Sequence, residues 1–166
     1  GSESTLVTIL EAEMILVPNP KQRVLSVWGY SDVYEAARHL DEILKCHPTG
    51  LEGIDSLLVQ DEVTKGIYKD SIARLPKGDG WLWVEFGGDS IEEAADKARA
   101  CYEQVKKIEK DSGKIPSFEV VEDPKIAHGL WKVREGSLGS TAWVPGLPDN
   151  WPGFEDSAVP VDKVAE

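Results

Sequence analysis

The sequence predicts an α+β domain: an antiparallel sheet of the ferredoxin-like (split βαβ) kind with helices on one face. Strand-like and helix-like patterns alternate along the 166 residues. In addition, the stretch WGYSDVYEAA (28–37) resembles FGGDSIEEAA (86–95), and in both a strand ends at a glycine before a capped helix. Two such units in tandem favour one sheet, to which a helical insertion and a long Gly/Pro/Trp C-terminal loop are added.

The first predicted strand is LVTILEAEMILV, residues 6–17. Its even positions are apolar except for Thr8, whereas Glu11 and Glu13 lie on the odd face. A period of two with one apolar face is typical of a half-buried strand. The Pro18-Asn19-Pro20 sequence then predicts a turn.

Residues 23–28 form the next predicted strand, which ends at a glycine. The segment SDVYEAARHLDEILK (31–45) has apolar residues at helical spacing, and Ser31 or Asp32 supplies its N-cap. TGLEGIDSLL then reads as a short strand that leads into a weaker helix over 57–73.

The second half opens with a strand at 81–86, WLWVEF, which is rich in residues of high β propensity. A long helix follows, and Ser90 with Glu93 forms a capping box at its start. A strand at 117–121 comes next, and Asp123 caps the final helix, DPKIAHGLWKVRE.

These elements fit a single domain over residues 1–166, a length that buries roughly 70% of the unfolded surface. The expected parts are a junction (1–5), a first half (6–56), an insertion (57–80), a second half (81–122), and a helix with a site-facing loop (123–160).

The net charge of −12, without a basic cluster, argues against nucleic acid and against anionic membrane surfaces as partners. No apolar run reaches the ~20 residues of a membrane span. Cys46 and Cys101 lack CxxC spacing, so we expect a reduced, cytoplasmic protein, with a single disulfide as the alternative. A second alternative for its location is attachment to a membrane surface through other domains.

No self-contained catalytic or metal centre is evident. His39, His47 and His128 have no pairwise spacing that places two imidazoles on one metal ion. The chain also has no G-x-S-x-G elbow, no P-loop and no G-x-G-x-x-G before a helix. We therefore predict no catalytic and no metal-binding residue within the chain.

Arg134 is the charged residue of most interest. By helical phase it extends an apolar stripe that contains Leu130 and Trp131. Such a guanidinium reaches the solvent edge, pairs with a carboxylate, or binds an anionic ligand. Gly136 and the small residues after it are expected to stop the helix, which leaves Arg134 near an exposed end.

The stretch after Arg134 combines three large aromatic residues, Trp143, Trp151 and Phe154, with four prolines. Disordered tails are poor in aromatic residues, so this segment is expected to cover a surface. The two alternatives are a loop packed on the sheet and a lid that lines a site with a partner domain.

Several stretches together resemble the C-terminal (cap) domain of FAD-linked oxidases of the glycolate oxidase and D-lactate dehydrogenase type, in particular those fused to an iron–sulfur half. They are GSESTLVTILEAEMILVPNP, LVQDEVTKGIYKDSIARLPKGDGWLWVEFGGDS, DPKIAHGLWKVREGSLGSTAW and FEDSAVPVDKV. The resemblance implies a cap with a ferredoxin-like core, an FAD-binding domain before residue 1, a C-terminal segment beyond residue 166, and an iron–sulfur cluster in a fused domain.

The resemblance also implies site residues. The family's G-S-E-G-T junction near the flavin is matched by Gly1, Ser2, Glu3 and Thr5, which makes Ser2, Glu3 and Thr5 the expected cofactor-binding residues, while Ser4 replaces the family's glycine. Gly1-Ser2 is either native sequence or a cloning remnant.

Substrate-binding residues are implied in the same way. The family's W-x-x-R-E arginine, which points toward the substrate carboxylate, corresponds to Arg134, and Asp156 matches the acidic position of the strand that enters the site. Leu138 and Phe154 stand where some relatives carry a threonine and a lysine. The family's G-H-x-G-D-G-N-x-H motif has no counterpart in this chain.

The expected function is therefore the substrate-binding portion of an enzyme that oxidises a small 2-hydroxy acid by hydride transfer to FAD, with the isolated chain inactive. Two alternatives remain open. One is a non-catalytic ferredoxin-like module that binds a ligand or regulates, and the other is a structural domain that dimerises through an exposed surface.

Overall fold

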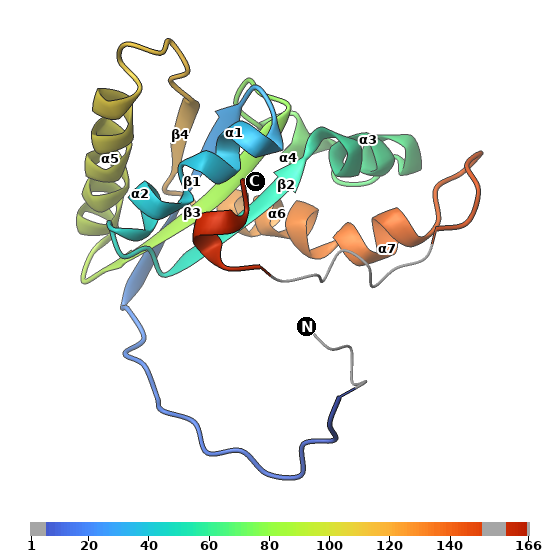
Figure 1. Ribbon diagram of the computed structural model, residues 1–166, viewed down its shortest axis with the longest axis horizontal. Coiled ribbons are helices and arrows are strands. Elements are labelled where there is room, and N and C mark those ends of the chain that lie inside the picture. The colour runs from blue at the N-terminus through green and yellow to red at the C-terminus, as the bar shows by residue number, and fades with distance from the viewer. Residues whose placement is uncertain (1–5, 151–158, 166) are drawn as a thin grey trace.

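The computed structural model describes residues 6–150 and 159–165 (Figure 1). Its four strands are β1 (Gln22–Tyr30), β2 (Gly50–Asp55), β3 (Gly80–Gly88) and β4 (Ser117–Val121). They form one sheet in the order β2-β3-β1-β4, and each neighbouring pair is antiparallel. The predicted α+β class with an antiparallel sheet is confirmed.

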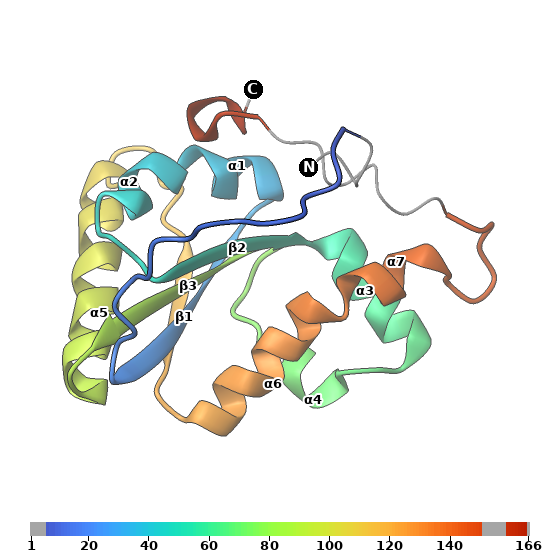
Figure 2. The same cartoon turned by 90° about the horizontal axis from the view of Figure 1, so that it is seen from below.

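Helices cover both faces of this sheet (Figure 2). The prediction of helices on one face is therefore wrong. The two helices that follow the repeated strand–glycine units, α1 and α5, lie with α2 on one face. The helix of the C-terminal part, α6, packs with α3 and α4 on the opposite face. The helical bounds are α1 (Val33–Arg38), α2 (Leu40–Leu44), α3 (Ser56–Lys65), α4 (Lys69–Ile72), α5 (Ile91–Ile108), α6 (Pro124–Glu135), α7 (Ser137–Ala142) and the 3₁₀ helix η2 (Val161–Lys163).

The two central strands are apolar on both sides because both sides are covered. Trp28 on β1 belongs to the core under α5, whereas its neighbour Val27 faces the core under α6. On β3, Trp83 and Val84 divide between the two cores in the same way, and both are fully buried. Burial on two faces explains why these strands read as nearly continuous apolar runs.

The predicted helix starts are confirmed. Asp32 accepts the backbone N–H of Glu35 at 2.8 Å and so is the N-cap of α1. Ser90 caps α5 by accepting the N–H of Glu93 at 3.1 Å, and Asp123 caps α6. Each cap satisfies a backbone donor that the helix itself leaves free, which fixes where the helix begins.

The strand predicted at residues 6–17 is wrong. The segment forms no strand, and Figure 1 shows it as an open loop that leaves the body of the domain. Its large apolar side chains are 64–94% exposed. It pairs with none of the four strands of the sheet, in which β1 is already paired on both edges with β3 and β4.

Two predicted helices are each interrupted. The helix expected over 31–45 divides into α1 and α2 at His39, and the helix expected over 57–73 divides into α3 and α4. The second break occurs at Gly66, whose φ of 73° lies in the left-handed region that ends helices.

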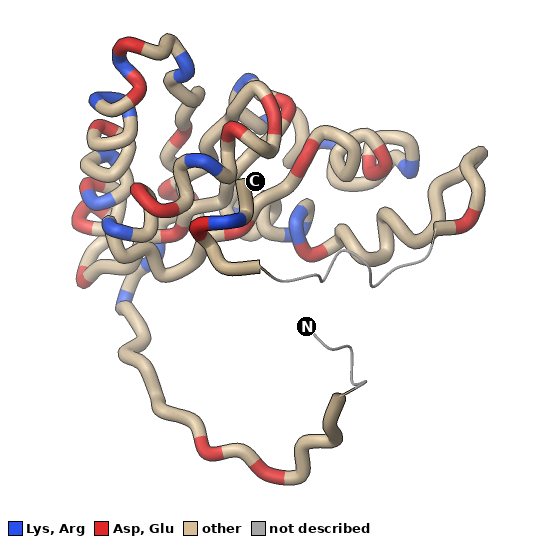
Figure 3. The backbone as a smooth tube through the Cα atoms, in the orientation of Figure 1, with Lys and Arg blue, Asp and Glu red and all other residues tan. Residues whose placement is uncertain are grey.

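Acidic and basic residues are interspersed along the backbone of the domain, and α5 carries both signs along its length (Figure 3). Among the described residues, no helix is long and apolar enough to cross a membrane.

Candidate functional site

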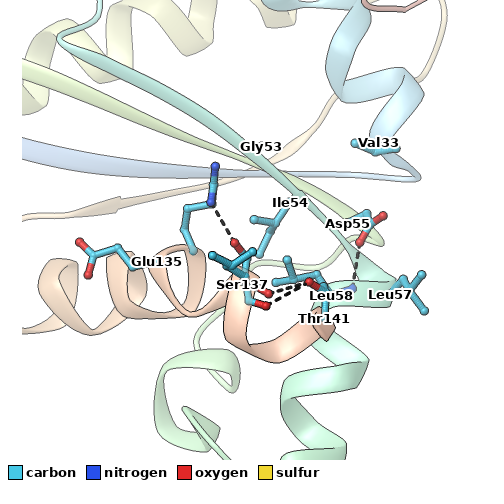
Figure 4. Close-up of a pocket in the computed structure, with 11 residues that line it drawn as sticks. Val33, Gly53, Ile54, Asp55, Leu57, Leu58, Glu135, Ser137 and Thr141 are labelled. Carbon is cyan, nitrogen blue, oxygen red and sulfur yellow. Dashed lines mark hydrogen bonds between the residues drawn. The ribbon is translucent and has the colours of Figure 1, made fainter. Parts of the chain in front are cut away.

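A pocket of about 590 Å³ opens where the end of β2 meets the first turn of α3 and the junction between α6 and α7 (Figure 4). Val33, the first residue of α1, completes the lining. Its lining residues are Val33, Gly53, Ile54, Asp55, Leu57, Leu58, Arg134, Glu135, Ser137, Leu138 and Thr141.

The direct passage from β2 into α3 builds one wall of this pocket. Asp55 is the last residue of β2 and also the N-cap of α3, and its carboxylate accepts the N–H of Leu58 at 2.9 Å. This cap turns the chain so that Leu57 and Leu58 present apolar side chains to the pocket, where Leu57 remains 62% exposed.

Arg134 stands on the opposite wall, in the last turn of α6, and of the three sequence alternatives it adopts the carboxylate pair. Its Nε and Nη2 atoms lie 3.0 and 2.9 Å from Oε2 of Glu52 on β2. Its Nη1 donates to Oγ of Ser137 at 3.1 Å. The Arg134 side chain keeps 34% of its surface exposed, so it is held in place without being sequestered.

The predicted end of the helix after Arg134 is only partly correct, because a second short helix, α7, starts at Ser137. The hydroxyls of Ser140 and Thr141 do not cap this helix. Instead, they donate hydrogen bonds to the carbonyls of Gly136 and Ser137, four residues earlier. Gly136 is required at the junction, since a Cβ there would lie 2.6 Å from the Tyr68 ring.

Helix α7 is fastened to α3. Lys65 donates to the carbonyl oxygen of Gly139 at 2.6 Å, and its Nζ lies 5.8 Å from the centroid of the Trp143 ring. The start of the Gly/Pro/Trp loop therefore contacts α3 and does not pack on the sheet. Trp143 remains 58% exposed, while the following Val144 is buried.

Among the described lining residues, Arg134 is the one cation. Two carboxylates share the lining with it, but Asp55 caps α3 and Glu135 pairs with Lys132 at 2.6 Å. The Lys132 hydrogen bond holds the pKa of the Glu135 carboxyl below its ordinary value. Figure 4 shows Glu135 directed away from the cluster around Ser137. The pocket thus offers one guanidinium among apolar and hydroxyl side chains, which suits a small molecule with a carboxylate group.

Sequence reasoning identified Arg134 but missed its two partners. Glu52 shares a face of β2 with the buried Ile54. A carboxylate on the covered face of a short strand was therefore the sequence feature that could have identified Glu52. Ser137 lies three residues after Arg134, a spacing at which helical side chains meet. The other predicted site residues, Ser2, Glu3, Thr5 and Asp156, lie outside the described residues, as do Trp151 and Phe154.

No group of three or more His, Cys, Asp or Glu side chains in the described ranges could hold a metal ion. His39 is buried, stacks on Tyr30 and lies 2.9 Å from a carboxylate oxygen of Glu109. Cys46 and Cys101 are both free thiols. The contacts of His39, Cys46 and Cys101 are therefore structural, and none of these three residues lines the pocket.

Comparison with known proteins identifies related chains. The family model described as FAD linked oxidases, C-terminal domain, matches residues 19–166. The chain is 26% identical over its whole length to D-2-hydroxyglutarate dehydrogenases from Pseudomonas putida and from Haemophilus influenzae, and it spans 17% of the length of each. It is also 26% identical to a D-lactate dehydrogenase from Anaerostipes hadrus, of which it spans 34%.

Proposed function

Because this chain belongs to the family of FAD linked oxidases, C-terminal domain, we propose that it is the cap, or substrate-binding portion, of a longer FAD-dependent oxidoreductase that oxidises a small 2-hydroxy acid. The observation that carries the proposal is Arg134, a partly exposed guanidinium on the wall of a pocket of about 590 Å³. Relatives named D-lactate and D-2-hydroxyglutarate dehydrogenases support the substrate class.

In this proposal, Arg134 binds the substrate carboxylate and thereby fixes the α-carbon that carries the hydroxyl. A guanidinium and a carboxylate form two parallel hydrogen bonds, which set orientation as well as position. FAD, when bound to the complete enzyme, supplies the acceptor for the hydride of the α-carbon.

We assign the flavin site to the part of the protein that precedes this chain. This assignment follows the resemblance, in which the flavin-binding domain precedes the junction that residues 1–5 match. We retain Ser2, Glu3 and Thr5 as the proposed contacts near the flavin and Asp156 as a second substrate-binding residue. An iron–sulfur cluster belongs, in the same proposal, to a fused domain of the longer protein.

Residues 6–17 support this assignment. They are mostly apolar, they expose their large apolar side chains, and they precede residue 19, where the family match begins. We propose that they become a strand of the upstream domain, where a sheet edge supplies the backbone partners that they lack here. In an isolated chain, the same exposed surface favours dimerisation.

The decisive experiment is substitution of Arg134 in the full-length enzyme. We expect Arg134→Ala to lower kcat/KM for D-lactate or D-2-hydroxyglutarate by about a hundredfold, since the carboxylate loses its charged partner. Arg134→Lys should restore only part of the loss, because an ammonium lacks the planar pair of donors. Arg99→Ala, which removes another arginine from an exposed ion pair on α5, is the matched control. Unchanged kcat/KM in Arg134→Ala would remove Arg134 from the site.

A second experiment separates this function from that of a self-contained ligand-binding module. The isolated 166-residue chain should neither bind FAD stably nor oxidise a 2-hydroxy acid, because the proposed flavin site lies elsewhere. A purified chain with a flavin absorption spectrum would contradict the proposal that the flavin site lies outside this chain. Tight binding of a metabolite by the chain alone would favour the module.

A further inference from the structure

The guanidinium of Arg134 is held by two side chains that the proposed function does not yet use. Glu52 approaches from β2, and Ser137 approaches from the first residue of α7. Arg134 itself belongs to α6, so three separate elements meet at this group. The structure therefore fixes the arginine from two directions before any ligand arrives.

The contacts leave a defined set of donors for a ligand. A guanidinium has five N–H groups. Within the described residues, Nε and Nη2 are directed to one oxygen of Glu52, and Nη1 is directed to Ser137. One N–H on each terminal nitrogen remains available to a ligand, and a carboxylate is the acceptor that suits two such charged donors.

The three residues also differ in their relation to the pocket. Arg134 and Ser137 both line it, and a hydrogen bond joins them. Glu52 is not among the lining residues and lies on a strand fixed by its ladder with β3. The ion pair with Glu52 therefore holds a residue of the pocket wall from outside the pocket.

We propose that Glu52 is a positioning residue, which orients Arg134 so that its two free N–H groups meet the substrate carboxylate. This inference rests on the proposed role of Arg134. A free arginine side chain loses about 2 kcal/mol of rotamer entropy when it is ordered. With Glu52 in place, that ordering occurs on folding and does not oppose substrate binding.

Positioning and charge predict opposite effects on binding. Glu52 is negative, so if it acted only through charge, its removal would strengthen the attraction between Arg134 and an anionic substrate and lower KM. If it acts by orientation, its removal frees the guanidinium, and KM rises while kcat falls. Glu52→Gln separates the two effects, because the amide oxygen still accepts from Arg134 but carries no charge.

The test uses the full-length enzyme, with D-lactate and D-2-hydroxyglutarate as substrates and a redox dye as electron acceptor. We expect Glu52→Ala to lower kcat/KM by about tenfold with a raised KM, since hydrogen bonds to charged groups are worth about 1.5–3 kcal/mol. We expect Glu52→Gln to stay within about twofold of the wild type, because one such bond is retained. Ser137→Ala, which removes a weaker contact, should lose roughly threefold.

Binding without turnover provides an independent measurement. 2-Hydroxy-2-methylpropanoate has the carboxylate and hydroxyl of lactate but no hydrogen on the α-carbon, so it cannot be oxidised. Its Kd, followed by the change in flavin absorbance, should rise in Glu52→Ala and be restored in Glu52→Gln. Glu122→Ala is the matched control, since Glu122 pairs with Arg99 in an exposed ion pair remote from the pocket. A variant that merely lost folded enzyme would show a lower apparent kcat with unchanged KM and unchanged Kd.

The outcomes are distinguishable. Impaired Glu52→Ala with near-normal Glu52→Gln supports positioning. Normal Glu52→Ala together with impaired Arg134→Ala overturns the role of Glu52 and leaves the proposed function intact. A lowered KM in Glu52→Ala also overturns positioning, because it traces the effect to charge. Equal losses in both Glu52 variants overturn it as well, because the acceptor that glutamine retains would then make no difference. A normal Arg134→Ala overturns the proposed function and this inference with it.

Discussion

Glu62 is a fully buried carboxyl group on α3, and replacing it with glutamine should change how the stability of the chain depends on pH. Its Oε1 lies 3.3 Å from Oγ of Ser140, while its Oε2 is buried without a hydrogen-bond partner among the described residues. The Ser140 hydroxyl also lies 2.9 Å from the carbonyl of Gly136. A protonated Glu62 fits this arrangement, because it can donate to Ser140 while Ser140 donates to Gly136.

Burial raises the pKa of Glu62 from its ordinary value of 4.5 to about 7, against a smaller opposing effect of the Ser140 hydrogen bond. The folded state therefore binds this proton more tightly than the unfolded state does. The stabilising effect is fully present below pH 4.5 and is lost as the pH rises through 7. One pKa unit corresponds to about 1.4 kcal/mol, so the ionised carboxyl costs the folded state about 3 kcal/mol at pH 8.5.

The measurement is urea unfolding of the wild type and of Glu62→Gln at pH 4.5 and pH 8.5. We expect Glu62→Gln to be more stable than the wild type by about 3 kcal/mol at pH 8.5, and we expect this difference to disappear by pH 4.5. Glu119→Gln on β4 controls for the loss of one negative charge at an exposed position. If Glu62→Gln shifts stability equally at both pH values, the buried carboxyl is not the titrating group.

Three further predictions concern packing and reactivity. Leu130→Ala truncates a side chain that is 1% exposed between α6 and the sheet. It should lower the free energy of unfolding by about 2–5 kcal/mol, and a loss below about 1 kcal/mol would mean that α6 is loosely packed. Gly80→Ala places a Cβ 2.4 Å from backbone atoms of Asp32 and Val33, so it should lower the Tm by several degrees. An unchanged Tm would show that the backbone at the start of α1 shifts at little cost in stability. Burial, aided by the neighbouring Cys46 thiol, raises the pKa of Cys101, so a thiol reagent should label Cys46 well before Cys101 in the native chain, and equal rates would contradict the buried position of Cys101.

The strands and helix starts could be predicted because local chemistry decides them. Asp32, Ser90 and Asp123 cap helices through hydrogen bonds to residues two or three positions away, so their effect is visible in the sequence. The repeated strand–glycine–cap pattern likewise marked β1 and β3, the two central strands. The resemblance to FAD-linked oxidases added the family and drew attention to Arg134.

Local sequence pattern gave wrong predictions of secondary structure where an element depends on contacts with another part of the chain. Residues 6–17 were predicted as a strand, yet they pair with no strand of the sheet in the described part of the chain. A strand requires backbone partners as well as a suitable face, and only the complete fold shows whether they exist. The short helix α7 was missed for the converse reason, because α3 stabilises a sequence of weak helical propensity.

The sequence by itself determined the α+β class, the positions of the capped helices and the helical phase that brings Arg134 to the open end of an apolar stripe. Each of these depends on residues within a few positions of one another. Tertiary structure alone decided that Glu52, 82 residues before Arg134, holds the guanidinium, and that Glu62 is buried beneath α7. Periodicity assigns a side chain to a face of its own element, but only the packing of one element on another determines which side chain it meets.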